Sequence, residues 1–81
     1  MIHKLIVIAV EHRRKEAEKL QKVLTEHGCK VKARLGLHEA GDLCSDEGLI
    51  ILQLIPDEPE GLAFLEDLNA LEGVRATFIE L

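Results

Sequence analysis

Metal-binding side chains gather around one short stretch of the chain. Histidine and cysteine, which bind zinc and nickel in proteins, occur here at His27, Cys29, His38 and Cys44. No pair of them has the close spacing of a Cys-x-x-Cys or His-x-His motif. Cys29 and Cys44 flank a predicted strand and lie on the order of 25 Å apart along it, so they share a metal only across subunits or through a folded-back loop. We retain His38 and Cys44 as candidate metal ligands; the alternative is that both are loop residues and that Cys29 is a small buried hydrophobe.

A run of positive charge marks a second candidate site. His12, Arg13, Arg14 and Lys15 fall at the start of a predicted helix, where the helix dipole disfavours cations. Positive side chains beside the free amides of a helix N-terminus suit a phosphate or a carboxylate. We therefore consider His12, Arg13 and Arg14 a candidate anion-binding site. The alternative is a solvated surface run, balanced by glutamates on the neighbouring turns.

Catalysis is not indicated by the sequence. The acidic residues between positions 42 and 60 fall in loops and helix starts, where carboxylates are usually solvated. No nucleophile stands beside a base at a recognisable spacing, and there is no glycine-rich phosphate loop. We therefore expect a protein that is not an enzyme and that carries no cofactor.

Length and composition narrow the possible classes of protein and of binding partner. The 81 residues suffice for a single domain, 1–81, whose core must be aliphatic because only 2% of the residues are aromatic. A net charge of -5 and the lack of stacking rings argue against direct binding to nucleic acid, and the charge also argues against an anionic membrane surface. The longest apolar runs are far shorter than the roughly 20 residues of a membrane span. Two cysteines are too few for a disulfide framework and no signal peptide precedes them, which favours a reducing cytoplasm.

The period of the hydrophobic pattern switches along the chain. Two continuous aliphatic runs predict central strands, and an alternating run predicts a half-buried edge strand whose other face is basic. Apolar residues at helical spacing predict two amphipathic helices that end at Gly28 and Gly73. The predicted elements are, in order, a strand at 5–10, a helix at 16–27, a strand at 31–38, a strand at 49–55, a helix beginning at 56–59 and a strand at 74–81.

This order predicts an α+β, ferredoxin-like βαββαβ sandwich, with a four-stranded antiparallel sheet and two helices on one of its faces. The other face has no element to cover it, yet both central strands are aliphatic on both sides. A second copy packed on that face is the simplest solution, so we expect a homo-oligomer, either a dimer or a tetramer. The alternative is partial cover by the chain ends or by the loop at 39–48. One alternating set of each central strand must point away from the helices, and we take as the candidate interface Ile6, Ile8, Val10, Ile50, Leu52 and Leu54. The alternative is the other set: Leu5, Val7, Ala9, Leu49, Ile51 and Ile55.

The chain resembles the small ACT-like proteins known as iron-only hydrogenase system regulators over nearly its whole length. The resemblance is carried by the stretches Leu5–Val10, Arg34–Leu37, Leu49–Leu52 and Leu68–Ala76. It implies a ferredoxin-like fold, oligomerisation through the sheet and a regulatory role, without an established ligand. In the wider ACT group, amino acids bind where the first strand turns into the first helix, typically at a glycine. Here that turn, Glu11–Arg14, contains no glycine, which argues against amino-acid binding.

Three functions remain open on the sequence. The first is a cytoplasmic regulatory or ligand-sensing module that oligomerises through its sheet and regulates a hydrogenase system. The second is an interaction domain that binds no small ligand. The third is a small nickel- or zinc-binding protein that uses histidine and cysteine. A regulator of this kind would reach DNA only through a partner, since the sequence has no helix-turn-helix or ribbon-helix-helix segment.

Overall fold

The computed structural model describes residues 2–11, 13–37, 48–55 and 62–81. Its helices and strands follow the predicted order, and the fold is the predicted ferredoxin-like βαββαβ sandwich. No helix in the described part of the chain is long and apolar enough to cross a membrane. The elements are β1 (Lys4–Val10), α1 (Arg13–Glu26), the 3₁₀ turn η1 (Gly28–Lys30), β2 (Val31–Leu37), β3 (Gly48–Leu54), α2 (Leu62–Asn69) and β4 (Val74–Glu80).

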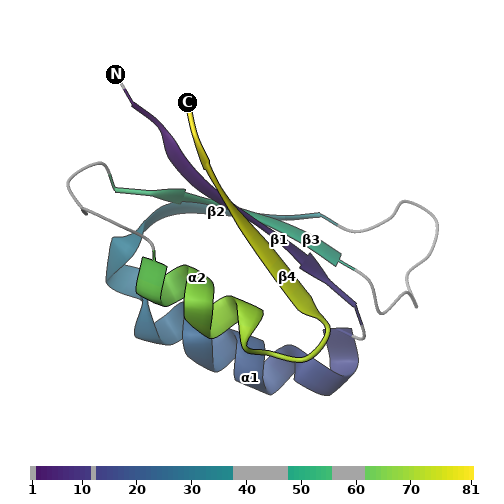
Figure 1. Cartoon of the computed structure of the whole chain (residues 1–81). Coiled ribbons are helices and arrows are strands. Elements are labelled where there is room, and N and C mark those ends of the chain that lie inside the picture. Colours follow the sequence, from purple (N-terminus) through teal and green to yellow (C-terminus); the bar gives the residue numbers. More distant parts are fainter. Residues whose placement is uncertain (1, 12, 38–47, 56–61) are drawn as a thin grey trace.

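The sheet has the strand order β2-β3-β1-β4, and each neighbouring pair is antiparallel. β1 and β3 are the central strands, as their aliphatic runs predict. Both helices lie against the same face of the sheet (Figure 1). The register places Ile6 opposite Leu52 of β3 and opposite Phe78 of β4. Directly opposed residues share a face, so this register decides which side chains lie beneath the helices.

The hydrophobic core lies between that face and the two helices. Phe64 of α2 is fully buried and supplies the one fully buried ring of the described residues, while the other buried side chains are aliphatic. A core built from so few aromatic atoms gains its stability from many small aliphatic contacts. The buried set is Ile6, Ile8, Val10, Leu20, Leu24, Leu52, Leu54, Phe64, Leu68 and Val74.

The side chains assigned from sequence to the uncovered face lie instead on the covered one, so that assignment is wrong. Five of the six are in the buried core, and Ile50 is partly buried and packs against it. The physical reason is that both faces of β1 and β3 are aliphatic, so hydrophobicity alone does not separate them. The residues that lie on the covered face, and not on the uncovered one, are Ile6, Ile8, Val10, Ile50, Leu52 and Leu54.

β2 departs from the simple alternation that its sequence predicts. The register with β3 shifts between Val31 and Ala33, which marks a β-bulge or similar irregularity. Val31 packs against the core, whereas Leu35 lies on the opposite face with 55% of its surface exposed. Arg34 pairs with Leu52 and therefore faces the helix side. The predicted alternation holds from Ala33 onward, with Arg34 and Gly36 on the other face, and the bulge moves only Val31 to the helix side. The prediction that the apolar face is half-buried is wrong, because Leu35 is largely exposed.

Gly73 joins the end of β1 to the start of β4. Its φ of +77° lies in the left-handed region, and its carbonyl accepts a hydrogen bond from the Glu11 amide at 2.7 Å. A Cβ at this position would lie 2.9 Å from the Glu11 carbonyl oxygen. Glycine is therefore required here both by backbone conformation and by space.

Candidate functional site

The sheet face opposite the helices is the main candidate for a functional surface, and we call it the open face. Its central row runs across all four strands as Leu35, Ile51, Val7 and Thr77, each directly opposite the next. No helix or strand of the described residues packs on this row (Figure 1). With the two flanking rows, the open face comprises Leu5, Val7, Ala9, Ala33, Leu35, Leu49, Ile51, Gln53, Arg75, Thr77 and Ile79.

Aliphatic atoms dominate the centre of the open face. Leu35 is 55% exposed and Leu49 is 36% exposed, while Val7 and Ile51 are half-buried by their neighbours on the sheet. Contiguous exposed aliphatic surface is uncommon on a monomer, so the open face is a candidate site of association.

Polar groups lie at the two ends of the open face. At one end the Gln53 side-chain amide donates to Nδ1 of His3 over 3.4 Å. At the other end the Arg75 guanidinium lies 3.8 Å from the Glu11 carboxylate, and both side chains are largely exposed. Such an exposed ion pair contributes little to stability. An apolar centre with a polar rim is the usual anatomy of a protein interface.

The sequence-predicted anion and metal sites fall mostly outside the described residues. His12, His38 and Cys44 lie outside them altogether, and Arg13 and Arg14 are described only as the backbone at the start of α1. Among the described side chains, no group of three or more His, Cys, Asp or Glu residues is arranged to hold a metal. Both sites therefore stay predictions.

Two other residues of the predicted metal cluster are placed by the structure. The Cys29 thiol is free and exposed, so the expectation that it is buried is wrong. His27 lies at the end of α1, where its ring stacks on Phe64 and its Nε2–H donates to the Asp67 carboxylate at 2.8 Å. These contacts assign His27 a structural role between the two helices. The sequence signal was its place on the inward stripe of the first helix.

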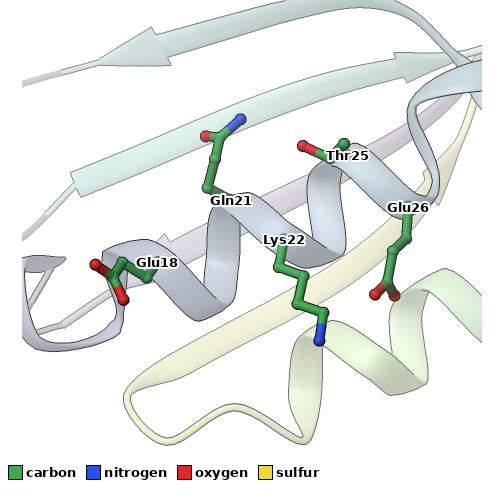
Figure 2. Close-up of a pocket in the computed structure, with 5 residues that line it drawn as sticks. All are labelled: Glu18, Gln21, Lys22, Thr25 and Glu26. Atoms are coloured by element: carbon green, nitrogen blue, oxygen red, sulfur yellow. The ribbon is translucent and has the colours of Figure 1, made fainter.

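A hollow of about 510 Å³ lies on the outer surface of α1. Figure 2 shows the side chains that line it, and all come from successive turns of the same helix. Gln21 and Thr25 point to one side, whereas Lys22 and Glu26 point to the other (Figure 2). A binding pocket needs polar groups that converge on one point, so this surface is not a pocket of that kind.

A second hollow, of about 310 Å³, lies between the C-terminal end of α1 and the edge strand β2. Leu24, Val31 and Leu52 form its apolar part, and Lys32 and Arg34 supply positive charge. Its volume is at the lower end of the range for small-ligand sites. No local sequence signal indicates this hollow, because its lining residues come from α1, β2 and β3, which are distant in sequence.

Sequence comparison matches the chain to no protein-family model and to no curated protein. Comparison of structures does find similar proteins. An uncharacterized protein from Thermotoga maritima superposes with a TM-score of 0.81 at 22% identity, over 100% of this chain and 99% of the other. A PII-like signaling protein from Thermus thermophilus gives 0.65 at 14% identity, over 100% of this chain and 88% of the other. The protein CPII from Thiomonas intermedia, bound to ADP, AMP and acetate, gives 0.55 at 20% identity, over 99% and 86%. At these identities the likeness establishes the shared fold.

Proposed function

We propose that this chain is a small regulatory module that associates with a second copy of itself through the open face. The observation that carries the proposal is the central row Leu35, Ile51, Val7 and Thr77, which crosses all four strands without cover from any described element. Burying this aliphatic surface against a copy of itself removes it from water, and a two-fold axis makes the same patch serve on both partners.

The size of the open face limits the area that this association can bury. Four strands of seven residues, spaced by about 4.8 Å and rising about 3.3 Å per residue, project an area of about 440 Å². The side chains make the accessible area larger than this projection. A standard stable interface buries roughly 600–1,000 Å² on each partner, so the projected area of the stacked faces alone lies below that range. We therefore expect a dimer that dissociates on dilution, or a tetramer in which further contacts add area.

The regulatory part of the proposal has separate support. The fold is shared with a PII-like signaling protein and with a CPII that binds ADP, AMP and acetate. The sequence also resembles the iron-only hydrogenase system regulators, and we propose regulation of such a system as the finer function. The exposed free thiol of Cys29 suits a reducing compartment such as the cytoplasm.

A binding role is proposed in preference to catalysis. The contacts of His27 with Asp67 and Phe64 join the two helices, so a structural role accounts for this residue. The side chains around the outer hollow of α1 diverge, with Gln21 and Thr25 on one side and Lys22 and Glu26 on the other (Figure 2). Such groups do not provide the nucleophile and base at hydrogen-bond distance that covalent catalysis needs.

The experiment that tests self-association is sedimentation velocity over a range of protein concentrations. The wild-type chain is expected to reach at least twice its monomer mass of 9.0 kDa as concentration rises. Ile51→Glu places a charge in the centre of the open face and is expected to raise the dissociation constant about 30-fold or more. Thr25→Glu, on the outer surface of α1, is the matched control and should associate like wild type. A 9.0 kDa monomer at high concentration would overturn the proposal.

Ligand sensing is tested separately by thermal shift with nucleotides, amino acids, nickel and zinc. A nucleotide shift that Arg13→Ala or Arg14→Ala removes supports a sensor with its anion site at the start of α1. A metal shift that His38→Ala or Cys44→Ala removes supports a metal-binding protein instead. If no compound shifts the melting temperature, the sensor is excluded and a plain interaction domain remains.

A further inference from the structure

Within the described residues, a side chain blocks the free backbone groups of one edge strand of the sheet, and no side chain does so at the other edge. We call such a block a seal. β4 forms one edge, and there the side chain of Asn69 in α2 bonds to both backbone groups of Ala76. Its Oδ1 accepts from the Ala76 amide at 2.8 Å, and its Nδ2 donates to the Ala76 carbonyl at 3.0 Å. The amide side chain thus occupies the hydrogen-bonding positions that a further strand would use at this residue.

β2 forms the other edge, and it has no comparable seal within the described residues. Only β3 pairs with it there, and the pairing is regular from Ala33 to Leu37, beyond the bulge. Strand edges present unpaired amide and carbonyl groups, and a partner strand can bond to these. A cover against strand addition is therefore seen at one edge and not at the other.

Two positively charged side chains, Lys32 and Arg34, lie on the edge strand β2. Neither Lys32 nor Arg34 makes a hydrogen bond or ion pair in the described part of the chain. Both line the hollow of about 310 Å³ beside this edge, together with the apolar Leu24 and Val31. The chain as a whole carries a net charge of -5, so this local positive charge opposes the overall balance. Its field attracts an acidic partner and repels a cationic one.

The space beside β2 is open on the helix side as well. A Cβ built on Gly36 would meet no atom within 4 Å. Gly36 lies opposite Ile50 and so shares the helix-covered side of the sheet. The described parts of the helices therefore leave Gly36 uncovered, and an added strand could place its side chains there.

We propose that the edge of β2 is a docking site for an extended acidic segment of a partner protein, which adds to the sheet as a fifth strand. Alternate side chains of that segment are acidic and face Arg34 on the helix side, next to Lys32 of the bulge, which lines the same hollow. The intervening side chains are aliphatic and lie beside Ala33 and Leu35 on the open face. A second copy of β2 is a poorer occupant, because antiparallel self-pairing brings the cations of both copies together.

The probe that tests this proposal is a capped seven-residue peptide that alternates glutamate and valine, with a lysine–valine peptide as its charge-reversed counterpart. Binding is followed by amide chemical shifts of the protein. We expect the glutamate peptide to bind about tenfold or more tightly than the lysine peptide, with the largest shifts in β2. Equal affinity for the two peptides, or shifts centred elsewhere, would overturn the proposal.

Two matched comparisons separate strand addition from simple charge attraction. Arg34→Glu should weaken binding of the glutamate peptide about tenfold, whereas Lys22→Glu, the same charge reversal on the outer surface of α1, should leave it unchanged. Methylating the backbone amides on one edge of the glutamate peptide keeps its charge and removes its strand hydrogen bonds, so binding should be lost. Retained binding by the methylated peptide, or equal effects of the two charge reversals, would show that no fifth strand forms.

Discussion

His27 and Asp67 join the two helices directly. Nε2–H of His27, in the turn after α1, donates to the Oδ2 of Asp67 in α2 over 2.8 Å. The His27 ring also stacks on Phe64, with ring centroids 4.4 Å apart and planes inclined by 11°. Its side chain is only 12% exposed, whereas that of Asp67 is 52% exposed. The pair therefore fixes how the end of one helix lies against the other.

We predict that His27→Ala lowers the free energy of unfolding by about 1–2 kcal/mol, because it removes both the ring stacking and the hydrogen bond. His27→Phe keeps the stacking and should lose less, while Asp67→Asn keeps an acceptor for Nε2–H and should stay near wild type. Urea unfolding followed by circular dichroism measures all three. Equal stability of His27→Ala and wild type would show that the contact between the helices is dispensable.

The left-handed turn at Gly73 gives a second prediction. Gly73→Ala should lower the free energy of unfolding by about 1–2 kcal/mol, since a Cβ is disfavoured at φ +77° and would crowd the Glu11 carbonyl. Gly36→Ala is the matched control, because its Cβ would meet nothing within 4 Å. Thermal unfolding of the two variants side by side tests the difference. A melting temperature lowered equally in both would contradict the account of the turn.

Neighbouring residues on β3 should respond to truncation in different ways. Leu52 is fully buried beneath the helices, so Leu52→Ala should lower the free energy of unfolding by about 2–5 kcal/mol. Ile51 lies on the open face, so Ile51→Ala should cost about 1 kcal/mol or less in dilute protein and should weaken self-association instead. Urea unfolding at low concentration, combined with sedimentation at high concentration, separates the two effects. The reverse pattern would mean that the faces of β3 are exchanged.

Removing the Asn69 side chain, which blocks the β4 edge, should change both the stability and the solubility of the protein. Asn69→Ala leaves the amide and carbonyl of Ala76 without their side-chain partner, and should lower the free energy of unfolding by about 1–2 kcal/mol. It also frees an edge for intermolecular pairing, so light scattering should rise faster on prolonged incubation. Gln21→Ala, on the outer surface of α1, is the control and should change neither. Unaltered scattering and stability in Asn69→Ala would remove the assigned role.

The sequence pattern was sufficient for the fold and insufficient for its faces. The switch between strand and helix periods predicted the element order and the central strands. On β1 and β3, both alternating sets of side chains are mainly aliphatic. The pattern therefore could not choose between Ile51 and Leu52 as the residue that points away from the helices. One polar signal was present, because Gln53 shares the phase of Ile51 and marks the open face. The β2 bulge and the Asn69 seal depend on tertiary pairing, which has no local sequence signal.

The strand order has a consequence for how the chain folds. β1 is the first strand in the sequence, yet its two neighbours in the sheet are β3 and β4. Ile6 must find Phe78 across almost the whole chain before the centre of the sheet can close. Among the described strands, only β2 and β3 are both consecutive in sequence and paired in the sheet. Because most of the paired strands are distant in sequence, the entropy cost of closing long loops is met before the contacts form. We therefore expect slow, all-or-none folding, in which loss of β4 unfolds the whole sheet.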